Sequence, residues 1–196
     1  MSEASSLSIL ALTIRTLLSD ATGLAESQIV IGPPHEAAEQ QEKDPDKDYL
    51  CVFIYRLAYS GFPSDTALND PLYLKAFCMI TALGGHSSIV TSGESELRLT
   101  GAVAECFHRN PAVKLKGEDG IIMSQVQIVP TQLTLDDINH LWATQNNTHY
   151  RLSLSYEFAL LPVPMKTRVD TAPKVGVVQL KLTSNPVLIT TAGDRK

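Results

Sequence analysis

Residues 72–83 read LYLKAFCMITAL, and this run supplies the central element of the predicted fold. Every second residue in it is apolar, which gives Leu72, Leu74, Ala76, Cys78, Ile80 and Ala82. Because side chains along a strand point alternately to the two sides of a sheet, this spacing predicts a central β-strand with one continuous apolar face. Gly84-Gly85 would end the strand. A helix over the same residues is the main alternative.

Four further runs have strand character. Residues 49–57 are β-branched and aromatic enough for a buried strand, and residues 28–31 form a short β-like run. Residues 121–129 alternate imperfectly, which indicates a bulge or a bend. Residues 150–160 alternate over at least four periods. One side of that last strand is predicted to hold Tyr150, Leu152, Leu154, Tyr156 and Phe158.

Three runs have helical character. Residues 6–21 carry apolar side chains at steps of three and four, as the buried face of a helix requires. Thr91 with Glu94, and Thr134 with Asp137, have the spacing of capping boxes and predict two more helix starts. The predicted buried face after Thr91 consists of Leu97, Gly101, Ala104 and Phe107 or His108, and Asn110-Pro111 would end that helix. Trp142 is the expected core anchor of the other.

The segment from His35 to Lys47 is acidic and contains no large apolar residue, so it is expected to be a solvated loop. Asp44, Asp46 and Asp48 alternate like the opening of a calcium loop. Position six of such a loop would be Tyr49 instead of glycine, and position twelve would be Tyr55 instead of glutamate. We therefore interpret the three aspartates as a solvated acidic turn.

Charge and composition exclude several classes of protein. There are 16 basic and 21 acidic residues, a net charge of −5, and no basic stripe, so nucleic-acid binding is not expected. No stretch is long and apolar enough for a transmembrane segment, and the N-terminus lacks the basic region of a signal peptide. Cys51, Cys78 and Cys106 lie far apart among apolar neighbours, which is typical of buried free thiols in a reducing compartment.

No set of residues has the spacing of a catalytic or metal site. The histidines lack metal-binding spacing, so no zinc and no cofactor is expected; they are His35, His86, His108, His140 and His149. Nucleophile-elbow, dinucleotide-binding and P-loop motifs are missing. The neighbouring carboxylates Glu94 and Glu96, and Asp136 and Asp137, lie at predicted helix starts, where the helix dipole favours negative charge. The sequence therefore predicts a protein that is not an enzyme, although a catalytic set assembled only in three dimensions stays open.

The compact pattern ends at Pro162 and Pro164, which divides the chain into a domain of residues 1–164 and a C-terminal arm of residues 165–196. Within the arm, apolar residues alternate with polar ones and then form a second apolar patch. A β-like segment beyond a domain often pairs with a strand of another chain. The candidate inter-subunit residues are Val178, Leu180, Leu182, Val187, Leu188 and Ile189.

Three stretches in fixed order carry a resemblance to a known family. They run from Leu68-Asn69-Asp70-Pro71 to Gly84, from Glu96-Leu97-Arg98 to Pro111, and from Leu133-Thr134-Leu135 through Trp142 to Glu157. Together they resemble the cap, or tail-terminator, proteins of extracellular contractile injection systems of the virulence-cassette and antifeeding-prophage type. The likeness covers most of residues 7–164.

The resemblance implies an α/β fold similar to phage tail terminators: a mixed β-sheet flanked by helices, here with an extended C-terminal β arm. It also implies a homo-oligomer, a hexameric ring that caps the sheath and inner tube of the particle. We expect synthesis and assembly in the cytoplasm, followed by release or membrane anchoring of the particle.

Two alternatives of other classes stay open. One is an adaptor that joins the particle to a membrane or to another component, a role that the acidic segment 35–47 could serve. The other is a small ligand-binding domain or enzyme, which would need a pocket with convergent polar groups.

Overall fold

The computed structural model describes residues 6–60, 72–86, 90–117, 120–145 and 148–163. The start of the first family-like stretch, Leu68-Asn69-Asp70-Pro71, and the whole arm 165–196 lie outside the described residues.

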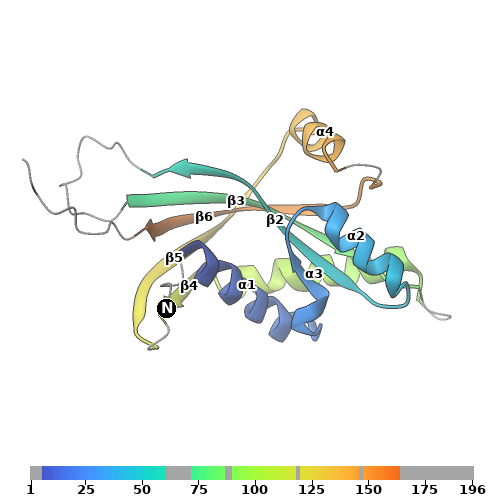
Figure 1. Cartoon of the computed structure of the whole chain (residues 1–196), viewed down its shortest axis with the longest axis horizontal. Coiled ribbons are helices and arrows are strands. Elements are labelled where there is room, and N and C mark those ends of the chain that lie inside the picture. Colours follow the sequence, from blue (N-terminus) through green and yellow to red (C-terminus); the bar gives the residue numbers. More distant parts are fainter. Residues whose placement is uncertain (1–5, 61–71, 87–89, 118–119, 146–147, 164–196) are drawn as a thin grey trace, which may run out of the picture. The chain divides into compact units, whose positions relative to one another are not determined.

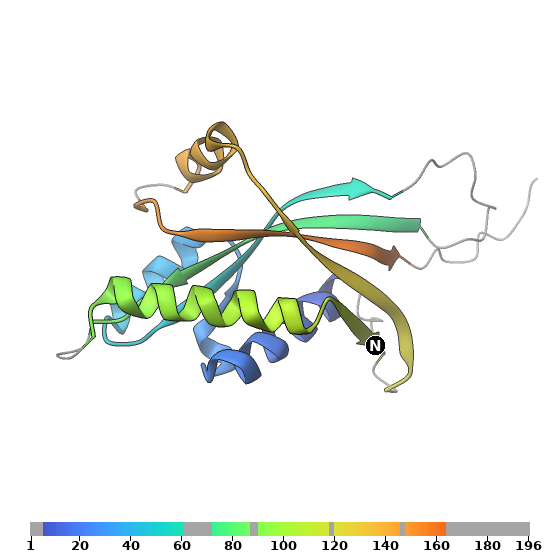
Figure 2. The same cartoon turned by 180° about the vertical axis from the view of Figure 1, so that it is seen from behind.

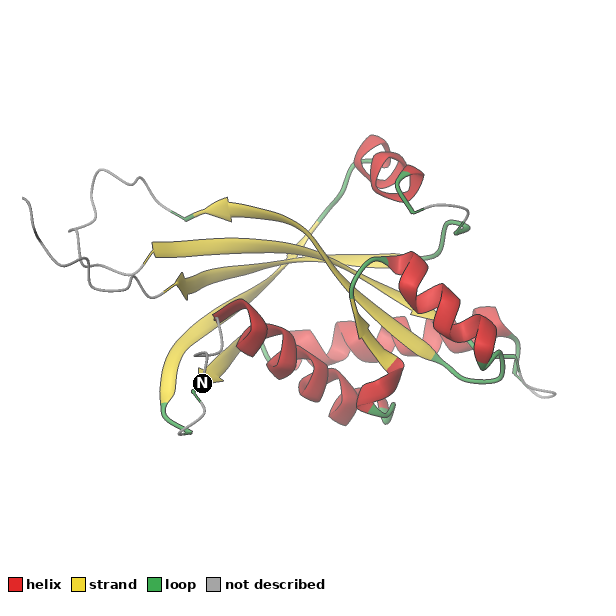
Figure 3. Ribbon diagram, viewed as in Figure 1, coloured by secondary structure: helices red, strands yellow, loops and turns green. Residues whose placement is uncertain are grey.

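Six strands form one mixed sheet in the order β1-β2-β3-β6-β5-β4 (Figures 1 and 3). Within the described residues only β1 and β2 run parallel, and every other neighbouring pair is antiparallel. This is the mixed sheet that the family resemblance implies. The strands are β1 (Ile29–Ile31), β2 (Tyr49–Tyr59), β3 (Leu72–Leu83), β4 (Ala112–Lys116), β5 (Ile122–Thr131) and β6 (Ser153–Val163).

Residues 72–83 form a central strand as predicted, and the helical alternative is wrong. β3 pairs with β2 on one side and with β6 on the other. Four residues of its alternating apolar face are buried in the main core: Ala76, Cys78, Ile80 and Ala82. A strand with neighbours on both sides and an apolar face over helices is the most buried position that this fold offers.

Two helices cover one face of the sheet (Figures 1 and 2). They are α1 (Ser6–Thr22) and α3 (Ser92–Arg109), and both pack into the main core. α2 (Pro34–Lys43) packs on the opposite face, where Ala37 contacts a smaller cluster that includes Cys51 and Leu83. α4 (Leu135–Ala143) stands apart from the other helices, and a single 3-10 turn, Glu26–Gln28, precedes β1.

The acidic segment after Pro34 is a helix, so the prediction of a solvated loop over 35–47 is wrong for most of its length. Pro34 occupies the first turn, where its missing N–H costs nothing. Ala37 is completely buried and Gln41 is 9% exposed. A helix needs only a narrow inner face when that face packs on a sheet, and two small or amide side chains fill it here.

The two capping boxes are confirmed, but the predicted inner face of α3 is wrong except at Phe107. Thr91 and Thr134 each accept a backbone hydrogen bond three residues ahead, and Glu94 and Asp137 each bond back. Leu97 is 63% exposed, and Gly101 has open space where a Cβ would lie. The buried face of α3 is rotated half a turn and comprises Ser95, Leu99, Val103, Cys106 and Phe107.

Strands β4, β5 and β6 each differ from the expected pattern or refine it in one detail. β4, which pairs with β5, was not predicted from the sequence. The slipped alternation of β5 is a register shift opposite Leu115 and Lys116, as predicted. β6 begins at Ser153 instead of 150, so Tyr150 and Leu152 are exposed, and Leu160 has a φ of 63° where the register with β3 shifts.

Candidate interaction surfaces

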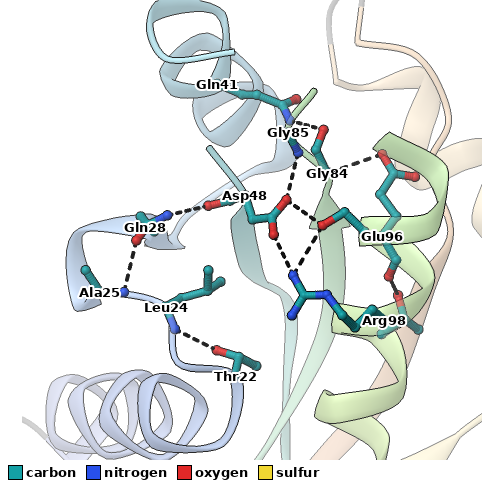
Figure 4. A network of polar contacts seen from close by, with 12 residues as sticks. Thr22, Leu24, Ala25, Gln28, Gln41, Asp48, Gly84, Gly85, Glu96 and Arg98 are labelled. Carbon is teal, nitrogen blue, oxygen red and sulfur yellow. Dashed lines mark hydrogen bonds and ion pairs between the residues drawn. The ribbon is translucent and has the colours of Figure 1, made fainter. Parts of the chain in front are cut away.

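Asp48 is the centre of a polar junction that ties the elements together (Figure 4). Its carboxylate accepts hydrogen bonds from the Gly85 N–H at 2.8 Å and the Ser95 hydroxyl at 2.6 Å, and it pairs with Arg98 at 2.8 Å. Its carbonyl accepts from Gln28. Asp48 is therefore a structural hub, and the predicted solvated acidic turn is correct only for Asp44 and Asp46, which are exposed.

A second set of polar contacts surrounds the end of β3. Gln41 on α2 donates to the Gly84 carbonyl at 2.7 Å, and the Gly84 N–H donates to Glu96 on α3. Glu96 also forms an ion pair with Arg151, just before β6. These contacts hold the helices of both faces to the sheet, so Glu96 is a positioning group within the fold and not only a helix-start charge.

Most titratable groups with a shifted pKa lie in helix caps or in the core. The Thr91 backbone and hydroxyl hold the pKa of Glu94 below its usual range, and the Thr134 hydroxyl and backbone do the same for the pKa of Asp137. Burial raises the pKa of the Cys51 thiol to about 12 and raises that of Cys78 further. Neutral thiols of this kind are poor nucleophiles, so their role is packing.

The histidines are spread over the domain as single side chains. His86, His108, His140 and His149 are exposed, and His35 is partly buried on α2. His35 and His149 share a hollow of about 390 Å³ with Glu39, Glu42 and Arg151. Among the described residues no group of three His, Cys, Asp or Glu side chains could hold a metal ion.

A pocket of about 330 Å³ lies between α4 and the sheet. The buried Trp142 lines it and packs edge-on against Tyr150 at 5.5 Å, so this residue anchors α4 and not the main core. Hydroxyl groups of the sheet line the opposite wall, and Thr131 and Ser155 bond to each other at 2.8 Å. Its described lining holds no carboxylate, histidine, lysine or cysteine, and Tyr150 and Tyr156 are its titratable side chains, so the pocket offers mainly apolar contacts and hydroxyl groups.

One edge of the sheet has a long unpaired section. β1 pairs with β2 only from Leu50 to Val52, and no described strand pairs with the same side of β2 from Phe53 to Tyr59. Leu57 is 48% exposed and Tyr59 67% exposed in this section. A strand edge with exposed apolar residues is a surface on which another strand can add.

The opposite edge of the sheet is β4. An open groove of about 600 Å³ runs between this strand and the outer side of α1, and it is lined by Ile9, Leu12, Thr13, Thr16, Leu17, Asp20, Lys114, Lys116 and Gly117. Leu12 is 55% exposed. Here too the backbone edge is unpaired within the described chain, and an apolar wall stands beside it.

The sequence pointed to a different surface. All six predicted inter-subunit residues, from Val178 to Ile189, lie outside the described residues. The two sheet edges were missed because an edge is defined by which strands pair at long range, and β4 was not predicted at all. Nothing in the sequence marked these edges, since Leu57 and Tyr59 look like ordinary strand residues.

No described helix is both long enough and apolar enough to cross a membrane.

The fold is shared with two solved structures. One is the sheath/tube terminator, in its extended state, of the PVC extracellular contractile injection system: 18% identity, TM-score 0.52, covering 92% of this chain and 64% of that one. The other is the tube-terminating cap of the anti-feeding prophage: 13% identity, TM-score 0.52, covering 87% of this chain and 60% of that one. The chain thus spans less than two thirds of either protein. No curated protein sequence matches it.

The family comparison covers the domain and the start of the arm. The family described as the Pvc16 N-terminal domain matches residues 9–176, a range that takes in nearly all of α1 and every later described helix and strand through β6. The match spans most of the chain, and the protein therefore belongs to the Pvc16 N-terminal domain family.

Proposed function

We propose that the chain is a structural, non-enzymatic terminator of a contractile injection particle, and that it ends the growth of sheath and inner tube by capping them. The observation that carries this proposal is the fold: 92% of the chain aligns with a sheath/tube terminator, and the family match covers the same domain. The surfaces of the domain fit the role, since they offer strand edges and an apolar groove.

The proposed cap is a ring of six copies. A head-to-tail interface generates a ring when its rotation closes, and a closed ring leaves no free subunit surface for further growth in its own plane. Its partners would be the sheath and inner-tube proteins beneath it. We propose that it assembles in the cytoplasm, where those proteins are made, and then remains part of the particle.

The C-terminal arm has a proposed role in holding the cap in place. Val178, Leu180 and Leu182 alternate with polar residues, as a strand with one apolar side requires. Together with the patch Val187, Leu188 and Ile189, they would add to a sheet of a neighbouring cap or sheath subunit.

Deleting the coding sequence in a host that makes the particle tests the capping function. We expect sheaths and tubes of uncontrolled length without a terminal ring, and the full chain supplied in trans should restore both. Particles of normal, uniform length that still carry an end ring would rule out the terminator function.

A chain truncated after Pro164 tests the arm separately. We expect particles whose end ring is missing or detaches during purification, because the added strand is lost. If particles with the truncated chain kept a firmly bound ring, the arm would have no role in attachment, while the capping function of the domain would stand.

A further inference from the structure

The two unpaired edges lie at opposite ends of the same sheet. The strand order places β2 next to the short β1 at one end, and β4 alone at the other (Figure 1). Beyond Val52 the outer side of β2 has no partner strand in the described chain. Exposed edges of this kind are usually protected, because their unpaired N–H and C=O groups attract other strands. The β2 edge of one copy and the β4 edge of a second copy can satisfy each other.

The exposed apolar residues of β2 lie on the side of the sheet that carries α1 and α3. Leu57 is opposite Ala76, and Tyr59 is opposite Leu74. Directly opposed residues of an antiparallel pair share a face, and both partners pack in or against the main core under those helices. Leu57 and Tyr59 therefore extend the core face of the sheet beyond the part that the helices cover.

The β4 edge presents a matching surface. Val113 and Leu115 are buried in the main core, so their side of β4 also faces the helices. A strand laid along β4 would place alternate side chains into the groove beside α1, against Ile9 and Leu12. That groove is apolar along α1 and open to the outside.

We propose that neighbouring copies join edge to edge: the section Phe53–Tyr59 of β2 in one copy pairs with β4 of the next, and Leu57 and Tyr59 enter the groove beside α1. The contact rests on the proposed ring and names the partner, a second copy of this chain. It is heterologous, since two different surfaces meet, and such a contact forms the proposed ring when its rotation closes.

The dimensions agree with this pairing. At a rise of about 3.3 Å per residue, the free section of β2 from Phe53 to Tyr59 is about 23 Å long and β4 is about 17 Å long. β4 therefore fits beside the free section without displacing β1. Arg56 projects from the other face of the sheet, whereas Lys114 and Lys116 line the groove itself, so the register must keep these like charges apart.

A pair of complementary variants tests the contact in the host that lacks its own copy of the chain. Leu57→Lys puts a cation on the β2 edge, and Leu12→Glu puts an anion in the groove. Either variant alone should give uncapped particles, because every interface in the ring then carries one introduced charge at the place where two leucines would meet. The two produced together should restore capped particles. Alternating copies then place the introduced lysine against the introduced glutamate at one interface and the native leucines together at the next.

Leu97→Lys is the matched control. Leu97 is exposed to a similar degree on α3, away from both edges, so this variant should cap particles normally. Thermal unfolding of the purified variants shows whether each still folds, which is expected because all three positions are on the surface.

The outcomes separate the contact from the function. Normal capping by either single variant, or failure of the mixture to restore caps, would overturn the edge-to-edge contact and leave the terminator function in place. If the host without any copy made normally capped particles, the terminator function itself would fail. If the ring were held through the arm alone, both single variants would cap particles and the chain truncated after Pro164 would not.

Discussion

Asp48 illustrates how one side chain can fix the relative positions of several elements. Its carboxylate accepts from the Gly85 backbone and from the Ser95 hydroxyl, and Ser95 is buried. Replacing Asp48 with alanine leaves both donors without that acceptor. We expect Asp48→Ala to lower the free energy of unfolding by about 3 kcal/mol, measured by urea denaturation.

Two control variants separate this effect from surface charge. Asp46 is exposed, so Asp46→Ala should change the stability by less than about 0.5 kcal/mol. Arg98 is 61% exposed in its side chain, so loss of its ion pair in Arg98→Ala should cost no more than about 1 kcal/mol. If Asp48→Ala and Arg98→Ala lowered the free energy of unfolding equally, the ion pair and not the buried donors would account for most of the stabilisation by Asp48.

Replacement by alanine should have opposite effects on stability at Gly84 and at Gly101. A Cβ at Gly84 would lie 2.0 Å from the backbone oxygen of Ser92, whereas a Cβ at Gly101 meets nothing within 4 Å. Gly84→Ala must push α3 away from the end of β3 and should cost about 3 kcal/mol. Gly101→Ala should stabilise by about 0.5–1 kcal/mol, because alanine is the better residue inside a helix. Thermal unfolding of both variants and of the parent chain shows whether each substitution lowers or raises the stability.

At the scale of elements, the helix starts depend on two threonines. Thr91 caps α3 and Thr134 caps α4, each in a reciprocal pair with a carboxylate. Thr91→Ala and Thr134→Ala should each cost about 1 kcal/mol of helix stability. For α4, which stands apart from the other helices, the loss should show as faster local hydrogen exchange instead of a lower global stability.

The carboxylate partners give these caps a pH dependence of known sign. The hydrogen bonds from Thr91 and Thr134 lower the pKa values of Glu94 and Asp137 in the folded protein. Stabilisation of this kind is fully present above the unfolded pKa of about 4 and is lost as the pH falls through the lower folded value. The stability difference between parent and Thr91→Ala should therefore narrow in acid. A difference that is unchanged down to about pH 2 would show that the carboxylate does not contribute.

Local patterns predicted the elements whose stabilising contacts are also local. The capping boxes, the alternation in β3 and the register slip in β5 all depend on residues a few positions apart, and they were predicted correctly. Most of the inner face of α3 was not. Leu97 and Leu99 each have further residues at helical spacing behind them, and which of the two series is buried depends on packing against the sheet. α2 was missed because its inner face is Ala37 and Gln41, which carry little apolar surface.

The candidate surfaces depend still more on long-range structure. Leu57 and Tyr59 look like ordinary strand residues until the pairing shows that β1 stops opposite Val52. The groove beside α1 exists only because β4, whose alternation extends over just five residues, becomes the last strand of the described sheet. The residues of an edge are thus defined by the absence of a neighbour, and no sequence pattern records that absence.

At the scale of the whole molecule, the two faces of the sheet should unfold together. Cys78 lies in the main core under α1 and α3, and Cys51 lies in the smaller cluster under α2. The polar junction around Asp48 and Gly84 links both clusters to the end of β3. Because this linkage leaves neither core able to open alone, one cooperative transition should expose both thiols.

The thiols make this cooperativity measurable as a loss of stability in alkali. Burial raises the pKa of Cys51 to about 12 and that of Cys78 further, while an unfolded cysteine ionises near a pKa of about 8.5. The folded state keeps both thiols neutral, so stability is fully present below about pH 8.5 and falls as the pH rises towards the folded pKa values. Each thiol contributes a slope of about 1.4 kcal/mol per pH unit.

Urea denaturation between about pH 9 and pH 11, with reductant present, should show the parent losing stability more steeply than the double variant Cys51→Ala/Cys78→Ala, by about 2.7 kcal/mol per pH unit. If removing Cys51 alone left the slope unchanged, the cluster under α2 would open before the global transition, and the two faces would not form one cooperative unit.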